Sequence, residues 1–215
     1  MNALAALAAL SGVVSIVAFQ TGPWLLAAVT KALTTLLIIA HAARRSGGDA
    51  YARAILAGLV ASLAGDVFLL WPQQGFLPGL VSFLVAHLAY LYAFSDGLKR
   101  GFARAPTIGY AIVAGVALAF LWGSVPGALR APVAVYVAAL VAMAAMAASR
   151  ALRSAPETAS FARIAAIGAG LFVMSDTMLA FNKFAGPIAF ANVFTLATYW
   201  LAQWAIASSV RPAAR

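Results

Sequence analysis

The stretch from Ala50 to Trp71, AYARAILAGLVASLAGDVFLLW, decides the fold. After Arg53 it carries a single ionisable side chain, Asp66, in an otherwise apolar run. A helix needs about 20 predominantly apolar residues to cross the hydrocarbon core of a bilayer. The stretch therefore predicts a transmembrane helix, and one that takes a carboxyl group into the membrane.

The rest of the chain has the same character. Of its 215 residues, 65% are hydrophobic and 9% are charged, whereas a soluble domain carries about 25% charged residues. The mean hydropathy is +0.98. So few charges cannot cover a water-soluble surface, and we expect an all-α fold, a polytopic bundle of transmembrane helices. The chain has no cysteine, which excludes disulfides and thiolate metal sites.

We expect residues 1–215 to form one integral membrane domain with about eight spans. Glycine–proline pairs such as Gly22-Pro23 and Gly186-Pro187 mark several of the breaks. The first apolar segment lacks a basic n-region and a small-x-small cleavage site, so we interpret it as a span and not as a signal peptide. The predicted spans are approximately 2–20, 23–43, 50–71, 76–95, 105–123, 131–150, 157–182 and 187–209.

The basic residues are distributed unevenly between the two sets of loops. One side carries only Arg130 and Lys183. Because lysine and arginine are enriched in cytoplasmic loops, we expect both termini in the cytoplasm. We interpret the net charge of +9 as an orientation signal and expect no nucleic-acid partner. We expect a multi-pass protein of a bacterial inner membrane. The other side carries Arg44, Arg45, Arg53, Lys99, Arg100, Arg104, Arg150, Arg153, Arg163, Arg211 and Arg215.

Two of the five acidic residues lie inside predicted spans. Asp49, Asp96 and Glu157 lie at span ends beside basic loops, where water or helix capping accounts for them. Asp66 and Asp176 do not, and a charged side chain at the bilayer centre costs about 2.5–3.5 kcal/mol on insertion scales. This cost marks the two aspartates as candidates for function.

Further polar side chains are expected at a similar depth, roughly 8–18 Å below the outer surface at about 1.5 Å per residue. Asn192, Thr195, Tyr199 and Gln203 recur at helical spacing and form one polar stripe. Lipid cannot satisfy such stripes, so they must face one another or a water-filled cavity. The residues expected at this site are Asp66 and Asp176 as catalytic groups, with Lys31, His87, Tyr90, Tyr136, Tyr199, Gln203 and Asn182 as positioning groups.

Structural interpretations of the same residues stay open. Lys31 can serve only to neutralise one aspartate as an ion pair, and His87 can be a hydrogen-bonded core histidine. Tyrosine and glutamine side chains often join neighbouring membrane helices without any catalytic role.

A pair of buried carboxyl groups is suited to acid–base chemistry, because burial favours the neutral form of one and a nearby cation favours the ionised form of the other. No Gly-x-Ser-x-Gly or HExxH motif is present. Asp66, His87 and Asp176 are a thin set of ligands for a metal ion. We therefore expect no metal and no cofactor.

Four motifs carry a family resemblance: SLAGDVFLL (Ser62–Leu70), GLVSFLVAHLAY (Gly79–Tyr90), GAGLFVMSDTMLAFNKF (Gly168–Phe184) and YWLAQ (Tyr199–Gln203). Together with Lys31 they resemble the YhhN family of membrane lysoplasmalogenases over nearly the whole chain. The resemblance implies eight spans, essential aspartates at Asp66 and Asp176, and a lysophospholipid substrate. The implied reaction is hydrolysis of the vinyl-ether bond of lysoplasmalogens to a fatty aldehyde and a glycerophospho-ethanolamine or -choline.

The expected mechanism uses Asp176 as the acid that protonates the vinyl ether and Asp66 as the base that activates water, by the two-carboxylate logic of glycoside hydrolysis. Lys31 would keep one aspartate ionised or bind the phosphate. Two other functions remain open at this point: a small proton-coupled transporter, which flux without product would indicate, and a metal-dependent lipid amidase, which sensitivity to chelators would indicate. A purely structural membrane protein is a third alternative.

Overall fold

The computed structural model describes residues 3–97, 99 and 101–212, so Arg100 and Arg215 of the orientation argument lie outside the described residues. The described chain is all-helical and contains no strand. Its eight helices are α1 (Ala3–Thr21), α2 (Trp24–Arg45), α3 (Ala50–Phe68), α4 (Phe76–Phe94), α5 (Arg104–Leu121), α6 (Gly127–Arg153), α7 (Pro156–Phe184) and α8 (Ala191–Ser208).

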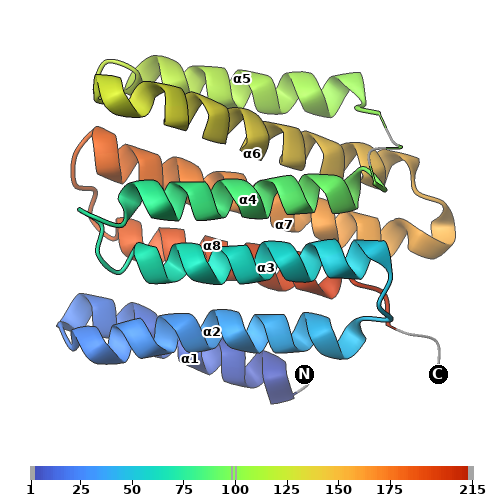
Figure 1. Ribbon diagram of the computed structural model, residues 1–215, viewed down its shortest axis with the longest axis horizontal. Coiled ribbons are helices and arrows are strands. Elements are labelled where there is room, and N and C mark those ends of the chain that lie inside the picture. The colour runs from blue at the N-terminus through green and yellow to red at the C-terminus, as the bar shows by residue number, and fades with distance from the viewer. Residues whose placement is uncertain (1–2, 98, 100, 213–215) are drawn as a thin grey trace.

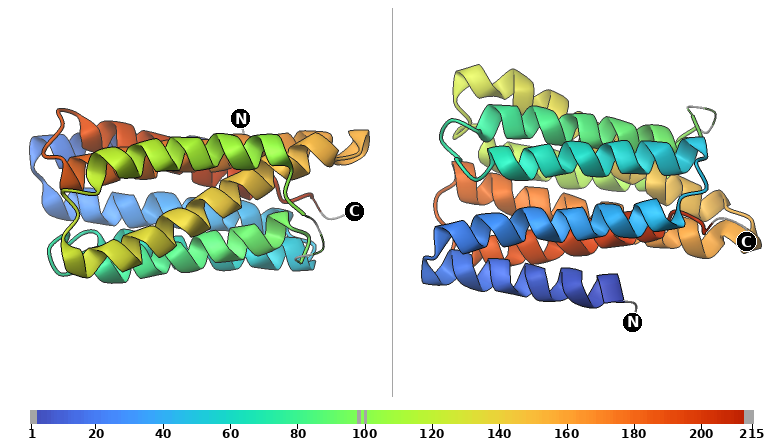
Figure 2. Two further views of the ribbon diagram at one scale, coloured as in Figure 1. Left: turned by 90° about the horizontal axis from the view of Figure 1, so that it is seen from above. Right: turned by 60° about the horizontal axis from the view of Figure 1, so that its bottom comes forward.

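The helices run along the long axis of the molecule, and most turn back beside the one before them, whereas α5 is separated from α4 by α6 (Figure 1). Helices α1 and α2, α3 and α4, and α7 and α8 form the most extensively packed pairs. Helix α8 also packs against α1, α2 and α3, which places it inside the bundle. Helix α5 lies at the edge, where it contacts α6 and α7, and α6 crosses the bundle obliquely between α5 and α4 (Figure 2).

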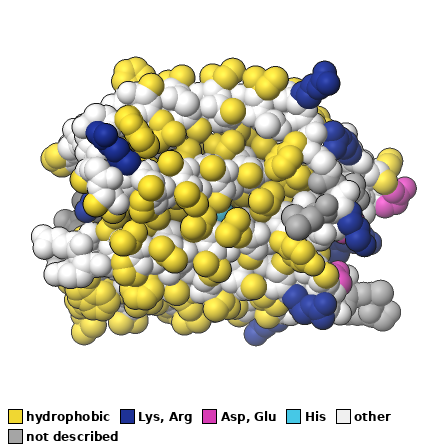
Figure 3. Space-filling view, turned by 45° about the horizontal axis from the view of Figure 1, so that its top comes forward, with side chains coloured by type: hydrophobic (Ala, Val, Ile, Leu, Met, Phe, Trp, Pro, Cys, Tyr) yellow, Lys and Arg dark blue, Asp and Glu magenta, His cyan; other side chains and the backbone are white. Residues whose placement is uncertain are grey.

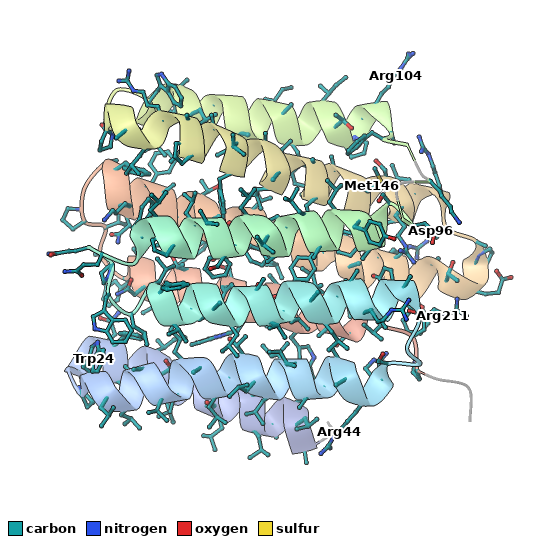
Figure 4. All side chains as sticks on the ribbon, viewed as in Figure 1. Trp24, Arg44, Asp96, Arg104, Met146 and Arg211 are labelled. Carbon is teal, nitrogen blue, oxygen red and sulfur yellow. The ribbon has the colours of Figure 1, made fainter. Side chains whose placement is uncertain are left out.

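Seven of the eight helices, all except α8, are long and apolar enough to cross a membrane. Helix α8 is less apolar because it carries the polar stripe, and Tyr199 and Gln203 of that stripe are buried in the bundle. Apolar side chains cover most of the face seen in Figure 3, and Lys and Arg gather mainly at one end of it. Arg44, Arg104 and Arg211 lie at that end and Trp24 at the opposite end (Figure 4).

Several helix boundaries differ by a few residues from those expected, and three of the differences have a local cause. Helix α6 begins at Gly127, directly after Pro126, and tolerates Pro132 in its second turn. Helix α3 ends at Phe68, short of the expected 71, because the chain turns at Leu69 and Leu70. Helix α8 begins at Ala191 and not at 187, because Phe190 has a left-handed backbone conformation with φ of 60°.

Two glycines allow α3 and α4 to approach closely. A Cβ atom on Gly58 would lie 2.3 Å from Cε1 of Tyr90, and one on Gly65 would lie 2.6 Å from Cε2 of Phe83. Such glycines are typical of contacts between membrane helices, where packing and not the hydrophobic effect drives association. The close approach brings the α4 side chains next to Asp66 on α3.

Candidate active site

The first polar cluster is built around Asp66 near the end of α3. Its Oδ2 atom accepts hydrogen bonds from Thr35 Oγ1 at 2.7 Å and from Tyr199 OH at 2.8 Å. Lys31 Nζ lies 3.5 Å from Oδ1 and also donates to the backbone oxygen of Asp66 at 3.0 Å. Asp66 is 2% exposed and Lys31 is 6% exposed. Two hydroxyl donors and a neighbouring ammonium suit an ionised carboxylate, which can only accept hydrogen bonds.

The second cluster is built around Asp176 on α7. Tyr136 OH donates to Asp176 Oδ2 at 2.5 Å, and His87 Nε2 lies 3.0 Å from the Tyr136 oxygen and 3.4 Å from Asp176 Oδ2. The hydroxyl hydrogen of Tyr136 is directed at the carboxylate, so its oxygen is free to accept from His87 Nε2–H. His87 is fully buried. The geometry forms a chain from His87 through Tyr136 to Asp176.

Aromatic rings lie between the two clusters. Phe172 packs edge-on against His87, with ring centroids 4.8 Å apart, and against Tyr199 at 5.5 Å. Phe83 packs edge-on against both Phe172 at 6.2 Å and Tyr199 at 5.7 Å. The two carboxyl groups therefore have separate hydrogen-bonding partners and are connected through an apolar layer.

The remaining expected residues divide into a buried pair and an isolated one. Tyr90 OH donates to Gln203 Oε1 at 2.7 Å, linking α4 to α8. The other end of the Gln203 amide, Nε2, is buried without a hydrogen-bond partner among the described residues, and the same holds for Ser62 Oγ. Asn182 lies apart, and its Oδ1 accepts from the backbone nitrogen of Ile188 at 2.9 Å. Asn182 thus shapes the turn between α7 and α8.

An apolar cavity reaches the second cluster. Its walls come from α4, α5, α6 and α7, and its polar side chains are Asp176, Tyr136 and Thr177. Of the residues expected to share one cavity, this cavity contacts Asp176 and Tyr136 and does not contact Asp66. Of the two carboxyl groups, Asp176 is thus the one that lines this cavity. The apolar lining residues include Leu69, Phe76, Leu80, Phe83, Val113, Leu121, Val125, Val133, Leu140, Val173 and Phe184.

The alternative in which Asp66, His87 and Asp176 together hold a metal ion does not fit this geometry. No group of three or more potential metal ligands comes together within the described part of the chain. Asp66 is bound by Lys31 and two hydroxyl groups, and a lysine ammonium competes directly with a cation.

Several residues of the site were not expected from the sequence. Thr35 shares a helical face with Lys31, and that spacing is the signal that could have identified it. Phe83 and Phe172 carry no such signal, because an apolar residue in a membrane span is uninformative by itself. Their positions depend on how the helices are rotated, which only the structure gives.

The fold and the site define a class: a multi-pass helical membrane protein with a histidine–tyrosine–aspartate cluster at an apolar cavity. The model of the YhhN family matches residues 26–210, and the chain belongs to the YhhN family. No solved structure matches the chain.

Three relatives show how similar this chain is to proteins named lysoplasmalogenase. The chain is 34% identical to lysoplasmalogenase TMEM86A of Bos taurus over 160 residues, which cover 72% of this chain and 64% of that protein. It is 34% identical to lysoplasmalogenase TMEM86A of Homo sapiens over 176 residues, covering 81% and 72% of the two proteins. It is 31% identical to lysoplasmalogenase TMEM86B of Homo sapiens over 188 residues, covering 85% and 74%.

Proposed function

We propose that this protein is a membrane lysoplasmalogenase of a bacterial inner membrane. It hydrolyses the vinyl-ether bond of a lysophospholipid to a fatty aldehyde and a glycerophospho-headgroup. The observation that carries the proposal is the position of Asp176. It is a carboxyl group in the wall of an otherwise apolar cavity, hydrogen-bonded to Tyr136, in a chain similar to named lysoplasmalogenases.

The reaction begins with the transfer of a proton from an acid to a carbon atom of the substrate. The protonated carboxyl group of Asp176 gives its proton to the outer carbon of the vinyl ether, and the C=C electron pair forms the new C–H bond. The resulting oxocarbenium ion lies beside the Asp176 carboxylate, which stabilises it and then takes a proton from water as the water oxygen bonds to the cationic carbon. Asp176, protonated again by this step, gives its proton to the glycerol oxygen and takes the hydroxyl proton of the hemiacetal as the C–O bond breaks, which yields the aldehyde and the alcohol and restores the protonated acid.

Tyr136 and His87 act on Asp176 in this scheme. Tyr136 bonds directly to the carboxylate oxygen, and His87 bonds to the Tyr136 oxygen from the protein interior. They hold the carboxyl group in one orientation, and they link it to a second site that can hold a proton. Such positioning is what general acid catalysis requires of the groups around the acid.

Asp66 has a structural role in this proposal and does not contact the substrate. The two-carboxylate scheme needs water to reach Asp66, whereas its oxygens are occupied by Lys31, Thr35 and Tyr199 and it does not line the cavity. We propose that the Lys31–Asp66 pair anchors Tyr199, whose ring packs against Phe83 in the cavity wall. Tyr90 and Gln203 tie α4 to α8 in the same layer.

The proposal is tested by incubating the purified protein with a panel of lysolipids and detecting aldehyde by mass spectrometry. Lysoplasmalogens are expected to release a fatty aldehyde, and the saturated ether analogues are expected to release none. In heavy water the aldehyde should carry one deuterium on its second carbon, because the mechanism places the solvent-derived proton there. Absence of aldehyde from every vinyl-ether lysolipid would reject the proposal.

A further inference from the structure

Two cations lie at the end of the bundle opposite the termini. Lys183 is in the last turn of α7 and Arg130 is in the first turn of α6, and both side chains are exposed. Within the described chain neither forms an ion pair with a carboxylate. They contrast with Lys31, which is buried against Asp66.

Both cations contact the wall of the cavity. Lys183 Nζ lies 4.9 Å from the ring centroid of Phe76, and Arg130 Nε donates to the backbone oxygen of Val125 at 3.3 Å. Phe76 and Val125 both line the cavity, and Val125 packs in one apolar cluster with Phe184, the neighbour of Lys183. The two positive charges therefore flank the same end of the cavity.

Helix geometry sets the distance between these charges and the acid. Lys183 follows Asp176 by two helical turns on α7, a rise of about 10 Å, and Arg130 precedes Tyr136 on α6 by about 9 Å. Because Tyr136 and Asp176 are hydrogen-bonded and the helices are antiparallel, both cations are displaced toward the same end. The backbone positions of the two cations therefore lie about 9–10 Å along the helix axes from those of Tyr136 and Asp176.

A lysoplasmalogen has its own charge at a matching distance. Seven bonds separate the phosphorus from the vinyl carbon that is protonated, which is roughly 9 Å at about 3.8 Å for every three bonds of an extended chain. With that carbon at Asp176, the phosphodiester reaches the level of Arg130 and Lys183. The hydrocarbon chain then points the other way, toward Val113, Leu140 and Val173 in the deeper part of the cavity.

We propose that Arg130 and Lys183 form the binding subsite for the phosphodiester of the lysophospholipid. This assignment rests on the proposed function, which supplies the substrate class. It gives the phosphate-binding role to these two residues and not to Lys31, because Lys31 is 6% exposed and is bound to Asp66. Arginine and lysine side chains at a water-facing rim bind phosphate through charge-assisted hydrogen bonds.

The test measures binding of a lipid that the enzyme cannot cleave. Native mass spectrometry compares saturated 1-O-hexadecyl lysophosphoethanolamine with 1-O-hexadecylglycerol, which lacks the phosphate. Lys183→Gln and Arg130→Gln should each weaken binding of the phosphate-bearing lipid by about tenfold, the effect of one charge-assisted hydrogen bond. Binding of hexadecylglycerol should stay within about twofold, and Lys183→Arg should retain most of the affinity for the phosphate-bearing lipid.

A matched control separates the subsite from a general effect of charge. The double variant Arg44→Gln with Arg163→Gln removes two exposed cations at the other end of the bundle and should bind both lipids as the unmodified protein does. Glycerophosphoethanolamine and inorganic phosphate serve as tail-free probes and should bind at least about tenfold more weakly, since they lack the contacts of the tail.

Two outcomes would overturn the assignment: unchanged binding of the phosphate-bearing lipid to the Arg130→Gln and Lys183→Gln double variant, or an equal loss for hexadecylglycerol. Inorganic phosphate binding as tightly as the lipid would instead indicate a site for free phosphate and also reject the assignment. Charge-dependent lipid binding without any aldehyde release from lysoplasmalogens would reject the hydrolase proposal and leave the lipid site standing. Aldehyde release with an unchanged KM in the double variant would reject only the lipid site.

Discussion

At the scale of single residues, Tyr136 connects the features on which the proposed chemistry depends. Its hydroxyl group donates to Asp176, lies 3.0 Å from His87 Nε2 and borders the cavity. A tyrosine in a membrane span can simply join two helices, but this one joins a carboxyl group to a histidine at the wall of the apolar cavity. Its removal should therefore affect catalysis more than folding.

Tyr136→Phe is expected to lower kcat for aldehyde release by about 10- to 100-fold, because Asp176 loses a charge-assisted hydrogen bond. Steady-state kinetics measure the effect, and thermal unfolding confirms that the protein is folded. Tyr92→Phe is the matched control, since Tyr92 lies on α4, is 44% exposed and is not part of the His87–Tyr136–Asp176 cluster. Equal activities of the two variants would contradict the role given to Tyr136.

Lys31→Met is expected to destabilise the folded protein by about 3–5 kcal/mol, because it leaves the Asp66 carboxylate buried without its cation. The double variant Lys31→Met with Asp66→Leu should recover much of that stability, since removing both members of a buried ion pair is often close to neutral. Unfolding in detergent measures both changes. A stable Lys31→Met protein, or a double variant no more stable than it, would show that the pair is not an anchor.

The sequence identified polar residues of the site better than it identified their partners. Asp66, Asp176 and Lys31 could be selected because a charge within a span is costly and therefore rarely present without a reason. The side chains that separate the two aspartates, Phe83 and Phe172, could not, because nothing in an apolar span tells which rings face inward. The expectation of one cavity shared by both aspartates followed from their common depth, which does not fix their rotation about the bundle.

At the scale of elements, the α3–α4 contact controls the position of Asp66 relative to α4. The contact depends on Gly58 and Gly65, which leave room for the rings of Tyr90 and Phe83. The sequence showed that glycine and alanine are abundant, as helix packing in membranes requires. It did not show which glycines face a ring.

Gly58→Ala is expected to destabilise the protein by about 1–3 kcal/mol, because the added methyl group would overlap the ring of Tyr90. Gly115→Ala on α5 is the control, since a Cβ there meets nothing within 4 Å, and it should be neutral or stabilising. Thermal unfolding of both variants is the measurement. Equal stability of the two variants would contradict the close helix contact.

At the scale of the whole molecule, the number and order of helices followed directly from hydropathy. Eight apolar segments separated by glycine, proline and basic residues became eight helices, because a bilayer allows few other ways to satisfy the backbone. The ends were less predictable, as the late start of α8 at Ala191 shows. The orientation of the bundle in the membrane stays a prediction from the basic residues.

That orientation can be measured by labelling single cysteines, since the chain has none of its own. Gly123→Cys lies in the exposed turn between α5 and α6, and Ala155→Cys lies in the exposed turn between α6 and α7. A membrane-impermeant maleimide applied to intact cells stripped of their outer membrane should label Gly123→Cys and should label Ala155→Cys only after lysis. The opposite pattern would place both termini outside the cytoplasm.

The proposed reaction depends on Asp176 supplying the proton that breaks the vinyl ether, and Asp176→Asn tests this most directly. The substitution keeps an oxygen for Tyr136 to donate to and removes the acid. In single-turnover experiments with a lysoplasmalogen, the variant should release aldehyde about 100- to 10,000-fold more slowly than the unmodified protein. Glu157→Gln, an exposed change at the start of α7, should have no effect. A folded Asp176→Asn protein that releases aldehyde at the rate of the unmodified protein would contradict the role of Asp176 as the acid.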